Sequence, residues 1–339
     1  MPLTTLVNDV LEALNHITGG RVVTSMDQVA AASHPFVVMK SSNIPGKSVM
    51  EFPGLVFGNP QAQVKKLAVT MTLTESAIEL AGATGVDVII AHHPIADAAN
   101  SGGVPLKYYL SLYNIAVIEL HEAFHGLHPG IPYLHGHRTL HVDIAYAGLP
   151  GNILFVGQAL EEIKTAGDIV SRLNLLMDKA TEEKMLEREK ELRDSWAMEE
   201  TVVATGPKIL NGSPDSPVKN ILHIFPHTGF SPAHLEKAVG EFPEVDTVLA
   251  SISRVRPDSA LVAKAKELGL NFIVGNSHAV EIFENGLPLA AAVQMLLPEV
   301  EVVLFRERVT AIPVAQAGNP NIKRYAAEIA TKYLVEKTS

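Results

Sequence analysis

Two adjacent histidines followed by a proline stand directly after an apolar segment. In the stretch VDVIIAHHP, His92, His93 and Pro94 follow the apolar residues 86–91. A β-branched run without polar alternation predicts a strand covered on both faces, and α/β sheets usually place their chemistry at the carboxyl ends of such strands. Because Pro94 ends the strand, both imidazoles can turn toward one metal ion or two neighbouring ions. The alternative is a histidine packed against a helix beside a hydrogen-bonded surface histidine.

A second histidine pair follows the next predicted strand, in the stretch LHEAFHG. His121 and His125 are four residues apart, which places them on one face of a helical turn and gives the spacing of a bidentate metal clip. In that geometry Glu122 points elsewhere. The alternative is a surface loop, but the position after a strand favours the clip.

A third group lies near the end of a later strand, in the stretch GNSHAVEIFENG. His278 and Glu281 are three residues apart and share one face of a helix, where Glu281 could bind a metal or act as a base. Glu284 is the less favoured substitute. The alternative makes Ser277 a helix N-cap and Glu281 a partner of the helix dipole, and both interpretations can hold together.

The elements around these groups alternate between strands and helices. Residues 65–73, 86–91 and 115–120 have strand patterns with helical patterns between them, and residues 220–225, 245–251 and 270–275 repeat the order. This alternation predicts an α/β fold built from βαβ units. The interval from Val86 to His121 nearly matches that from Val245 to His278, so we expect two halves of similar topology.

The overall composition narrows the partners and ligands of the protein. A net charge of -10 without a basic cluster argues against a nucleic-acid or anionic-membrane surface. Because the sequence has no cysteine, a metal must be held by His, Asp, Glu or backbone oxygen. The first twenty residues resemble an amphipathic helix more than a signal peptide, which predicts a cytoplasmic protein, and residues 287–298 are too few to span a membrane. Neither dinucleotide nor P-loop glycine motif follows an early strand.

A histidine-rich segment, residues 128–143, separates the two halves. Its glycines and prolines predict an irregular polar loop, with an additional site at His135 and His137 as the less favoured alternative. The predicted division of the chain is a first metal-ligand half at 1–125, an inserted His-rich loop and helices at 126–215, and a second half at 216–339.

The three groups together resemble the Nif-three-like dinuclear metal-centre family, to which the activity of GTP cyclohydrolase I type two is often assigned. The resemblance rests on IIAHHP, on the histidine after the next strand with its partner four residues later, and on G-x-x-H-x-x-E, and it covers roughly residues 1–125 and 150–315. It implies two intertwined domains of similar topology with largely parallel or mixed sheets, metals between them, and a homohexamer. The chain diverges from the family because His125 stands where an aspartate is usual, and Ser277 stands at a ligand histidine position beside His278.

These observations lead to one hypothesis and one alternative. The first hypothesis is a metal-binding protein that acts as a metal-dependent hydrolase on a small cytosolic substrate, with Glu281 or Glu122 acting as the catalytic base. The alternative is a non-catalytic metal-binding regulator or adaptor, which would hold a saturated metal without an adjacent pocket. One or two divalent ions (Zn, Fe, Mn, Co or Ni) would bind to a ligand set of histidine and glutamate side chains: His92, His93, His121, His125, His278 and Glu281.

Overall fold

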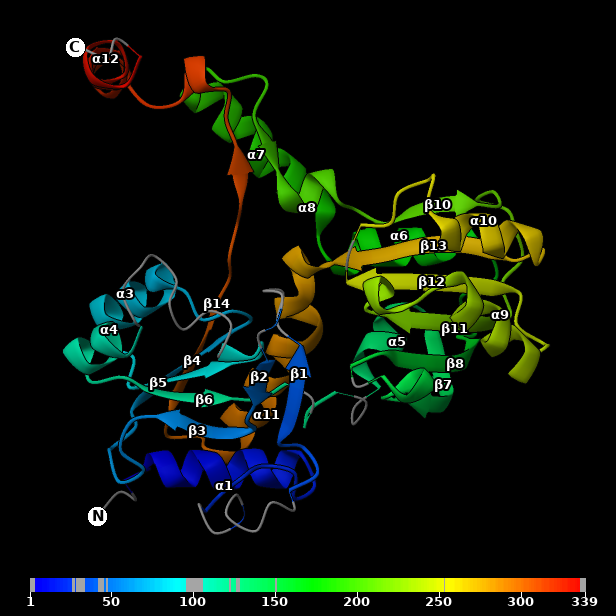
Figure 1. The fold of residues 1–339 in the computed structure, drawn as a ribbon, viewed down its shortest axis with the longest axis horizontal. Coiled ribbons are helices and arrows are strands. Elements are labelled where there is room, and N and C mark those ends of the chain that lie inside the picture. Colours follow the sequence, from blue (N-terminus) through cyan, green and yellow to red (C-terminus); the bar gives the residue numbers. More distant parts are fainter. Residues whose placement is uncertain are drawn as a thin grey trace.

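Two mixed β-sheets organise the chain in the computed structural model (Figure 1). The structure describes residues 4–25, 28, 34–41, 46, 48–95, 106–121, 123–125, 129–149, 151–252 and 254–335. We call the five-stranded sheet with its covering helices the first lobe, and the six-stranded sheet with its helices the second lobe. A third part, an arm, projects from both.

The first sheet has the strand order β14-β4-β5-β6-β3. Its strands are β3 (Gly54–Phe57), β4 (Lys66–Thr70), β5 (Val88–Ala91), β6 (Ala116–Glu119) and β14 (Glu301–Phe305). All are parallel except β3, which pairs antiparallel with β6. Every residue of β5 and β6 is buried, as expected for apolar strands inside a parallel sheet.

The second sheet has the strand order β10-β13-β12-β11-β8-β7. Its strands are β7 (His137–Asp143), β8 (Ile153–Ala159), β10 (Lys208–Asn211), β11 (Asn220–Phe225), β12 (Thr247–Ile252) and β13 (Asn271–Ser277). The three successive strands β11, β12 and β13 are parallel, and β10 runs antiparallel beside β13. The first sheet shows the same order, with β3 beside β6, so the mixed α/β fold and the two similar halves are confirmed.

Helices cover both faces of each sheet. In the first lobe α1 (Val7–Ile17) and α11 (Leu287–Leu296) pack on one face, and α3 (Glu75–Thr84) and α4 (Leu106–Tyr113) on the other. In the second lobe α6 (Ala166–Leu176) packs opposite α9 (Pro232–Glu241) and α10 (Ala260–Glu267). None of the described helices combines the length and apolar character needed to cross a lipid bilayer.

The chain passes between the lobes more than once. After β6 it builds the second lobe, and after β13 it returns through a 3-10 turn, η5 (His278–Val280), and a π-helix, η6 (Ile282–Gly286), into α11 and β14 of the first lobe. The lobes are therefore intertwined. The three-part division at 1–125, 126–215 and 216–339 stays a prediction.

The histidine-rich segment is ordered rather than irregular. It contains a short helix, α5 (Gly130–Leu134), and the whole of β7, which is the edge strand of the second sheet. The expectation of a polar loop is wrong because β7 pairs with β8 from His137 onward, which draws His135 and His137 into the core.

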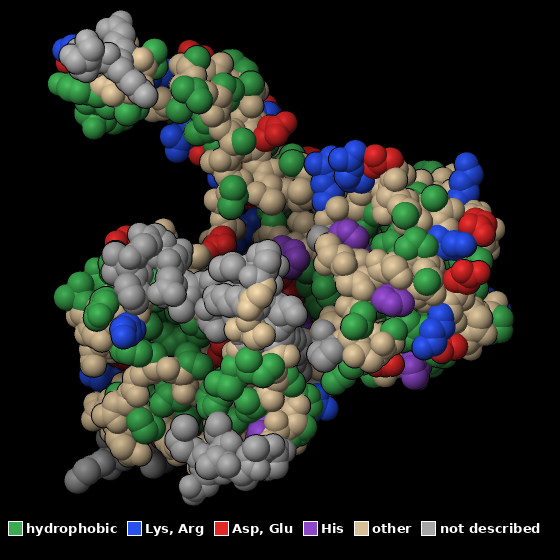
Figure 2. Space-filling view, viewed as in Figure 1, with side chains coloured by type: hydrophobic (Ala, Val, Ile, Leu, Met, Phe, Trp, Pro, Cys, Tyr) green, Lys and Arg blue, Asp and Glu red, His purple; other side chains and the backbone are tan. Residues whose placement is uncertain are grey.

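The arm extends beyond both lobes (Figures 1 and 2). It contains α7 (Lys179–Arg193), a small sheet of β9 (Glu199–Glu200) with β15 (Thr310–Ala311), and the terminal helices α12 (Pro320–Ile329) and η8 (Ala330–Val335). The arm also includes α8 (Thr201–Ala204) and the 3-10 turn η7 (Val314–Gln316). Short elements elsewhere are β1 (Val38–Ser41) paired with β2 (Ser48–Glu51), and the 3-10 turns η3 (Tyr146–Gly148) and η4 (His227–Gly229).

Candidate metal centre

The carboxyl ends of parallel strands from both sheets face one cavity of about 330 Å³. In the first lobe, residues that follow β5 and β6 line this cavity. In the second lobe, its lining comes from the last residues of β11 and β12 and from the first residue after β13. At the end of β12, Ile252 has a φ of 73°, a conformation that β-branched residues rarely adopt. The side chains that concern the site are His93, His121, His125, Phe225, Ile252, His278 and Glu281.

His92 is the innermost residue of the site and has no exposed surface. Its Nδ1 lies 2.9 Å from the carbonyl oxygen of Leu120, which assigns the ring proton to Nδ1 as the donor and leaves a lone pair on Nε2. Burial lowers the pKa of His92 to about 4, so the ring is neutral at pH 7. A neutral imidazole with an available nitrogen is the form that binds metal ions.

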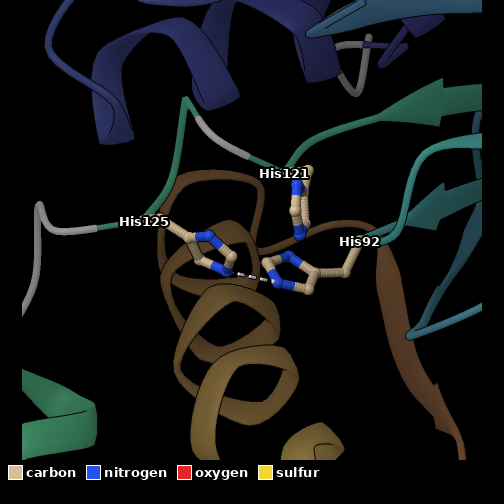
Figure 3. Close-up of side chains that lie close together, drawn as sticks. All are labelled: His92, His121 and His125. Carbon is tan, nitrogen blue, oxygen red and sulfur yellow. Dashed lines mark hydrogen bonds between the residues drawn. The ribbon is translucent and has the colours of Figure 1, made fainter. Parts of the chain in front are cut away.

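Two further histidines turn their rings toward His92 (Figure 3). The backbone N–H of His125 donates to the carbonyl of His121 at 3.2 Å, which forms the helical turn predicted for LHEAFHG. The Nε2 atoms of His92 and His125 are 2.9 Å apart, and the ring centroids of His121 and His125 are 4.4 Å apart. We call His92, His121 and His125 the histidine triad, since each offers a nitrogen within 4.8 Å of the others.

Glu51 supports the histidine triad from outside. One carboxylate oxygen of Glu51 lies 3.1 Å from Nδ1 of His121, and the glutamate is 1% exposed. A carboxylate that accepts from one ring nitrogen orients the imidazole and directs the other nitrogen to a metal. Glu51 therefore fixes the orientation of His121 toward the centre.

A second group shares His92 and adds a carboxylate. Glu281 is buried, with Oε2 3.0 Å from Nε2 of His93 and Oε1 3.6 Å from Nε2 of His92. Burial acts to raise the pKa of Glu281, but the imidazoles of His92 and His93 outweigh it and hold the pKa well below its usual range. We call His92, His93 and Glu281 the glutamate triad, since their ligand atoms also lie within 4.8 Å of one another.

Neighbouring polar groups fix the members of the glutamate triad. Nδ1 of His93 lies 2.9 Å from Oγ1 of Thr72, which leaves Nε2 directed at the carboxylate. The side-chain amide of Asn285 donates to Oε1 of Glu281 at 3.1 Å. The carboxylate is therefore ionised and held in place, which are properties of a metal ligand.

The two triads cannot both use His92. Its Nδ1 donates to Leu120, so only Nε2 remains for a cation, and one lone pair binds one cation. The buried His and Glu groups could thus hold one ion through His92, and a second ion would have to rely on the other members.

The remaining predicted residues lie at different distances from this centre. His278 is exposed, lines the cavity, and has its ring centroid 5.8 Å from that of His93, but it belongs to neither triad. The hydroxyl of Ser277 pairs with Thr205 at 2.7 Å instead of capping the following turn. Glu284 accepts a hydrogen bond from Asn276 and belongs to neither triad, and Glu122 lies outside the described residues.

Several contributors to the site were not predicted from the sequence. Glu51 comes from β2, and no local pattern connects it with His121. Thr72 follows β4 and meets His93 from the neighbouring strand. Asn285 could have been found, because it stands four residues after Glu281 and thus on the same face of a helix.

His135 and His137, the alternative site in the histidine-rich segment, lie elsewhere in the core. Their rings form a separate cluster with His223, and the ring centroids of His135 and His223 are 4.8 Å apart. Among the described residues, this cluster does not bring three ligand atoms close enough together to hold an ion.

Comparisons with known proteins give a family match over part of the sequence and similar folds over most of the chain. The family model Duf34/NIF3 (NGG1p interacting factor 3) matches residues 40–100, which include His92 and His93. Reduced HcgD from Methanocaldococcus jannaschii is similar at 15% identity and a TM-score of 0.56, over 89% of this chain and 98% of that one. A Bacillus cereus protein related to NIF3 is similar at 12% identity and a TM-score of 0.55, over 90% and 98%. No curated protein matches the sequence.

Proposed function

We propose, from the premise that this chain is a NIF3-like protein by its matched segment and its fold, that it is a metal-dependent hydrolase of a small substrate. The histidine triad would hold the tighter divalent ion. A second, weaker ion would depend on His93 and Glu281, with His278 as a further candidate ligand.

The observation that carries the proposal is the convergence of lone pairs on one point. Nε2 of His125 lies 2.9 Å from Nε2 of His92, and Oε1 of Glu281 lies 3.6 Å from the same atom. One hydrogen can bridge only two of these three atoms, whereas a metal ion can bind all three at once. Nitrogen and carboxylate ligands without thiolate suit Zn, Fe, Mn, Co or Ni.

The adjoining cavity favours a hydrolase over a regulator or adaptor without turnover. A divalent cation held by such ligands supplies Lewis acidity and makes water a stronger nucleophile at neutral pH. The cavity gives a substrate room beside the triads, and Asn152 and Thr228 are among the polar residues that line it. Both oxygens of Glu281 are engaged, by Asn285 and His93, which supports the role of ligand more than that of base.

The lining of the cavity also bears on the substrate. Among the described residues that line it there is no Lys or Arg, whereas Phe225, Pro226 and Ile252 supply apolar surface. A triphosphate would find no side-chain cation there and would have only the bound metal ions to neutralise its charge, so a small uncharged molecule suits the cavity better than GTP. The assignment of GTP cyclohydrolase activity comes from the family resemblance alone.

Metal analysis followed by a hydrolysis screen tests the proposal. Purified protein is dialysed against buffered Zn(II) or Mn(II), its metal content is measured, and it is assayed with uncharged amides and esters and with GTP. We expect bound metal and hydrolysis of an uncharged substrate that EDTA abolishes. Metal-loaded protein without hydrolysis of any of them would favour the regulator or adaptor.

We further propose a closed homo-oligomer, most readily a hexamer, in the cytoplasm. Support for self-association comes from α12, which has no buried residue and exposes Ile322 and Tyr325 on the arm. Figure 2 shows hydrophobic side chains along this arm. Light scattering at micromolar concentration should give six times the mass of the chain, and a monomer would contradict it.

A further inference from the structure

A second cluster of buried polar side chains lies in the second lobe, where the histidine-rich segment meets the sheet. Burying polar groups costs free energy unless they are hydrogen-bonded, so a cluster of this size has a structural or functional reason. Each of its members is at most 2% exposed: His135, His137, His223, Ser251, Asn276 and Glu284.

One branch of the cluster stays within the second sheet. Nε2 of His137 lies 3.0 Å from Nδ1 of His223, and Nε2 of His223 lies 2.7 Å from Oγ of Ser251. These residues belong to β7, β11 and β12. This branch joins strands and has no contact with the candidate metal centre among the hydrogen bonds described.

The other branch leaves the sheet and reaches η6. Nδ1 of His135 donates to the carbonyl of Ile131 at 2.9 Å, so its Nε2 accepts from the backbone N–H of Asn276 at 3.2 Å. The side-chain amide of Asn276 then donates to Oε1 of Glu284 at 2.7 Å. Nε2 of His135 lies 3.7 Å from the same oxygen. The branch ties α5 and β13 of the second lobe to the π-helix.

The π-helical turn carries both this contact and the metal-ligand contact. Glu284 on η6 binds Asn276, while its neighbour Asn285 donates to Glu281, the residue just before the turn. Beyond η6 the chain enters α11, which packs into the first lobe. π-Helical turns are rare and recur at functional sites, and this one holds both contacts within one turn.

Glu284 meets Asn276 as a neutral carboxylic acid. Burial raises the pKa of Glu284 to about 8, against the opposing effect of the hydrogen bond from Asn276. Burial also lowers the pKa of His135 to about 4, so the two residues form no ion pair at pH 7. A glutamine has the same shape as a protonated glutamate and can accept the same hydrogen bond.

We propose that Glu284 is a positioning residue for Glu281: its bond to Asn276 fixes the π-helical turn against the second lobe, so that Glu281 faces His92 and His93. The proposal rests on the proposed metal centre. Glu284 is then a residue outside both triads that influences how tightly the centre binds a metal ion.

Zinc affinity by chelator competition tests the proposal, with Glu284→Ala, Glu284→Gln and, as a matched control, Ser251→Ala. Ser251→Ala also removes a buried hydrogen bond of the cluster but leaves η6 untouched. We expect Glu284→Ala to weaken binding of the second zinc ion, which depends on Glu281, by about 10- to 100-fold, in line with other outer-shell changes, and Glu284→Gln and Ser251→Ala to bind like the native chain. Equal binding by Glu284→Ala, or equal weakening by Ser251→Ala, would overturn the proposal.

A metal-free structure of Glu284→Ala separates this proposal from the proposed function. Loss of the 3.1 Å contact between Asn285 and Glu281 would support positioning whether or not zinc binds. Retention of that contact would overturn it. Failure of the native chain to bind zinc would instead overturn the proposed metal centre.

Discussion

The Nε2 atom of His92 lies 2.9 Å from Nε2 of His125, although 33 positions separate the two residues in the sequence. Because His92 donates its ring proton to Leu120, only His125 can supply a hydrogen between the two nitrogens. A cation can take the place of that hydrogen and also engage His121. This relationship makes the histidine triad the centre of the account.

Replacing His125 by aspartate should raise the occupancy of a second metal position. A neutral imidazole binds one cation and adds no negative charge, whereas a carboxylate can bridge two cations and reduce their repulsion. We expect about one tightly held ion per native chain, and His125→Asp should approach two. Metal analysis after dialysis measures this, with His125→Asn as the uncharged control. Two equivalent ions in the native chain, unchanged in His125→Asp, would remove His125 from the site.

Glu51→Gln should weaken metal binding without changing any ligand. The carboxylate accepts from Nδ1 of His121, and an amide in its place accepts more weakly and no longer makes the ring more basic. We expect zinc affinity to fall by about 10-fold or more. Glu187→Gln on the exposed face of α7 is the matched control. Equal affinity in both variants would show that Glu51 has no influence on the centre.

Gly275→Ala should destabilise the protein because no space exists for a methyl group. An added Cβ would lie 2.5 Å from Nε2 of His135, whose ring is held at both nitrogens. We expect the free energy of unfolding to fall by about 1–3 kcal/mol, the usual cost of overpacking a core. Gly240→Ala on α9, where nothing lies within 4 Å, should be neutral or stabilising by up to about 1 kcal/mol.

The cause is checked by denaturant titration of three variants: Gly275→Ala, His135→Ala and the double variant that combines them. Without the imidazole, the added methyl group should cost much less, which gives a favourable coupling between the two changes. Additive losses would mean that the strain arises elsewhere.

The metal-free protein should lose stability as the pH falls from 6.5 toward 4. Burial lowers the pKa of His135 to about 4 and that of His137 to about 3, from 6.5 in the unfolded chain. The unfolded state therefore binds more protons in this window, so the stabilisation is complete above pH 6.5 and is lost on acidification. Each such group contributes a slope of about 1.4 kcal/mol per pH unit.

Free energies of unfolding in EDTA at several pH values test this dependence. His137→Gln should flatten the slope, because one buried titrating group is gone. His141→Gln, at an exposed position on the same strand, should leave the slope as it is. A native slope that His137→Gln does not change would show that His137 is protonated in the folded state.

The strand-end pattern was enough to predict three members of the triads. His92 and His93 follow β5 and His121 follows β6, and of these His93 and His121 line the cavity. His278 also follows a strand, but η5 begins there and the turn brings Glu281, three residues later, to His92. Local spacing could not decide which of the two residues the turn would present.

Contacts that depend on distant pairing could not be predicted in this way. Glu51 reaches His121 across 70 positions, because β2 lies near the first lobe's strand ends. The burial of His137 depends on Gly157, where an added Cβ would lie 2.5 Å from its ring. Neither relationship has a periodicity within one segment, and composition alone suggested a loop for residues 128–143.

Metal binding by His92→Ala tests the central claim most directly, because both triads contain His92. Zinc is titrated against a chelator for three proteins: the native chain, His92→Ala, and a control, His16→Ala, at an exposed position on α1. Circular dichroism verifies that each of them is folded. The account predicts about one tight zinc ion for the native chain and for His16→Ala, and none for a folded His92→Ala. Undiminished zinc binding by folded His92→Ala would contradict it.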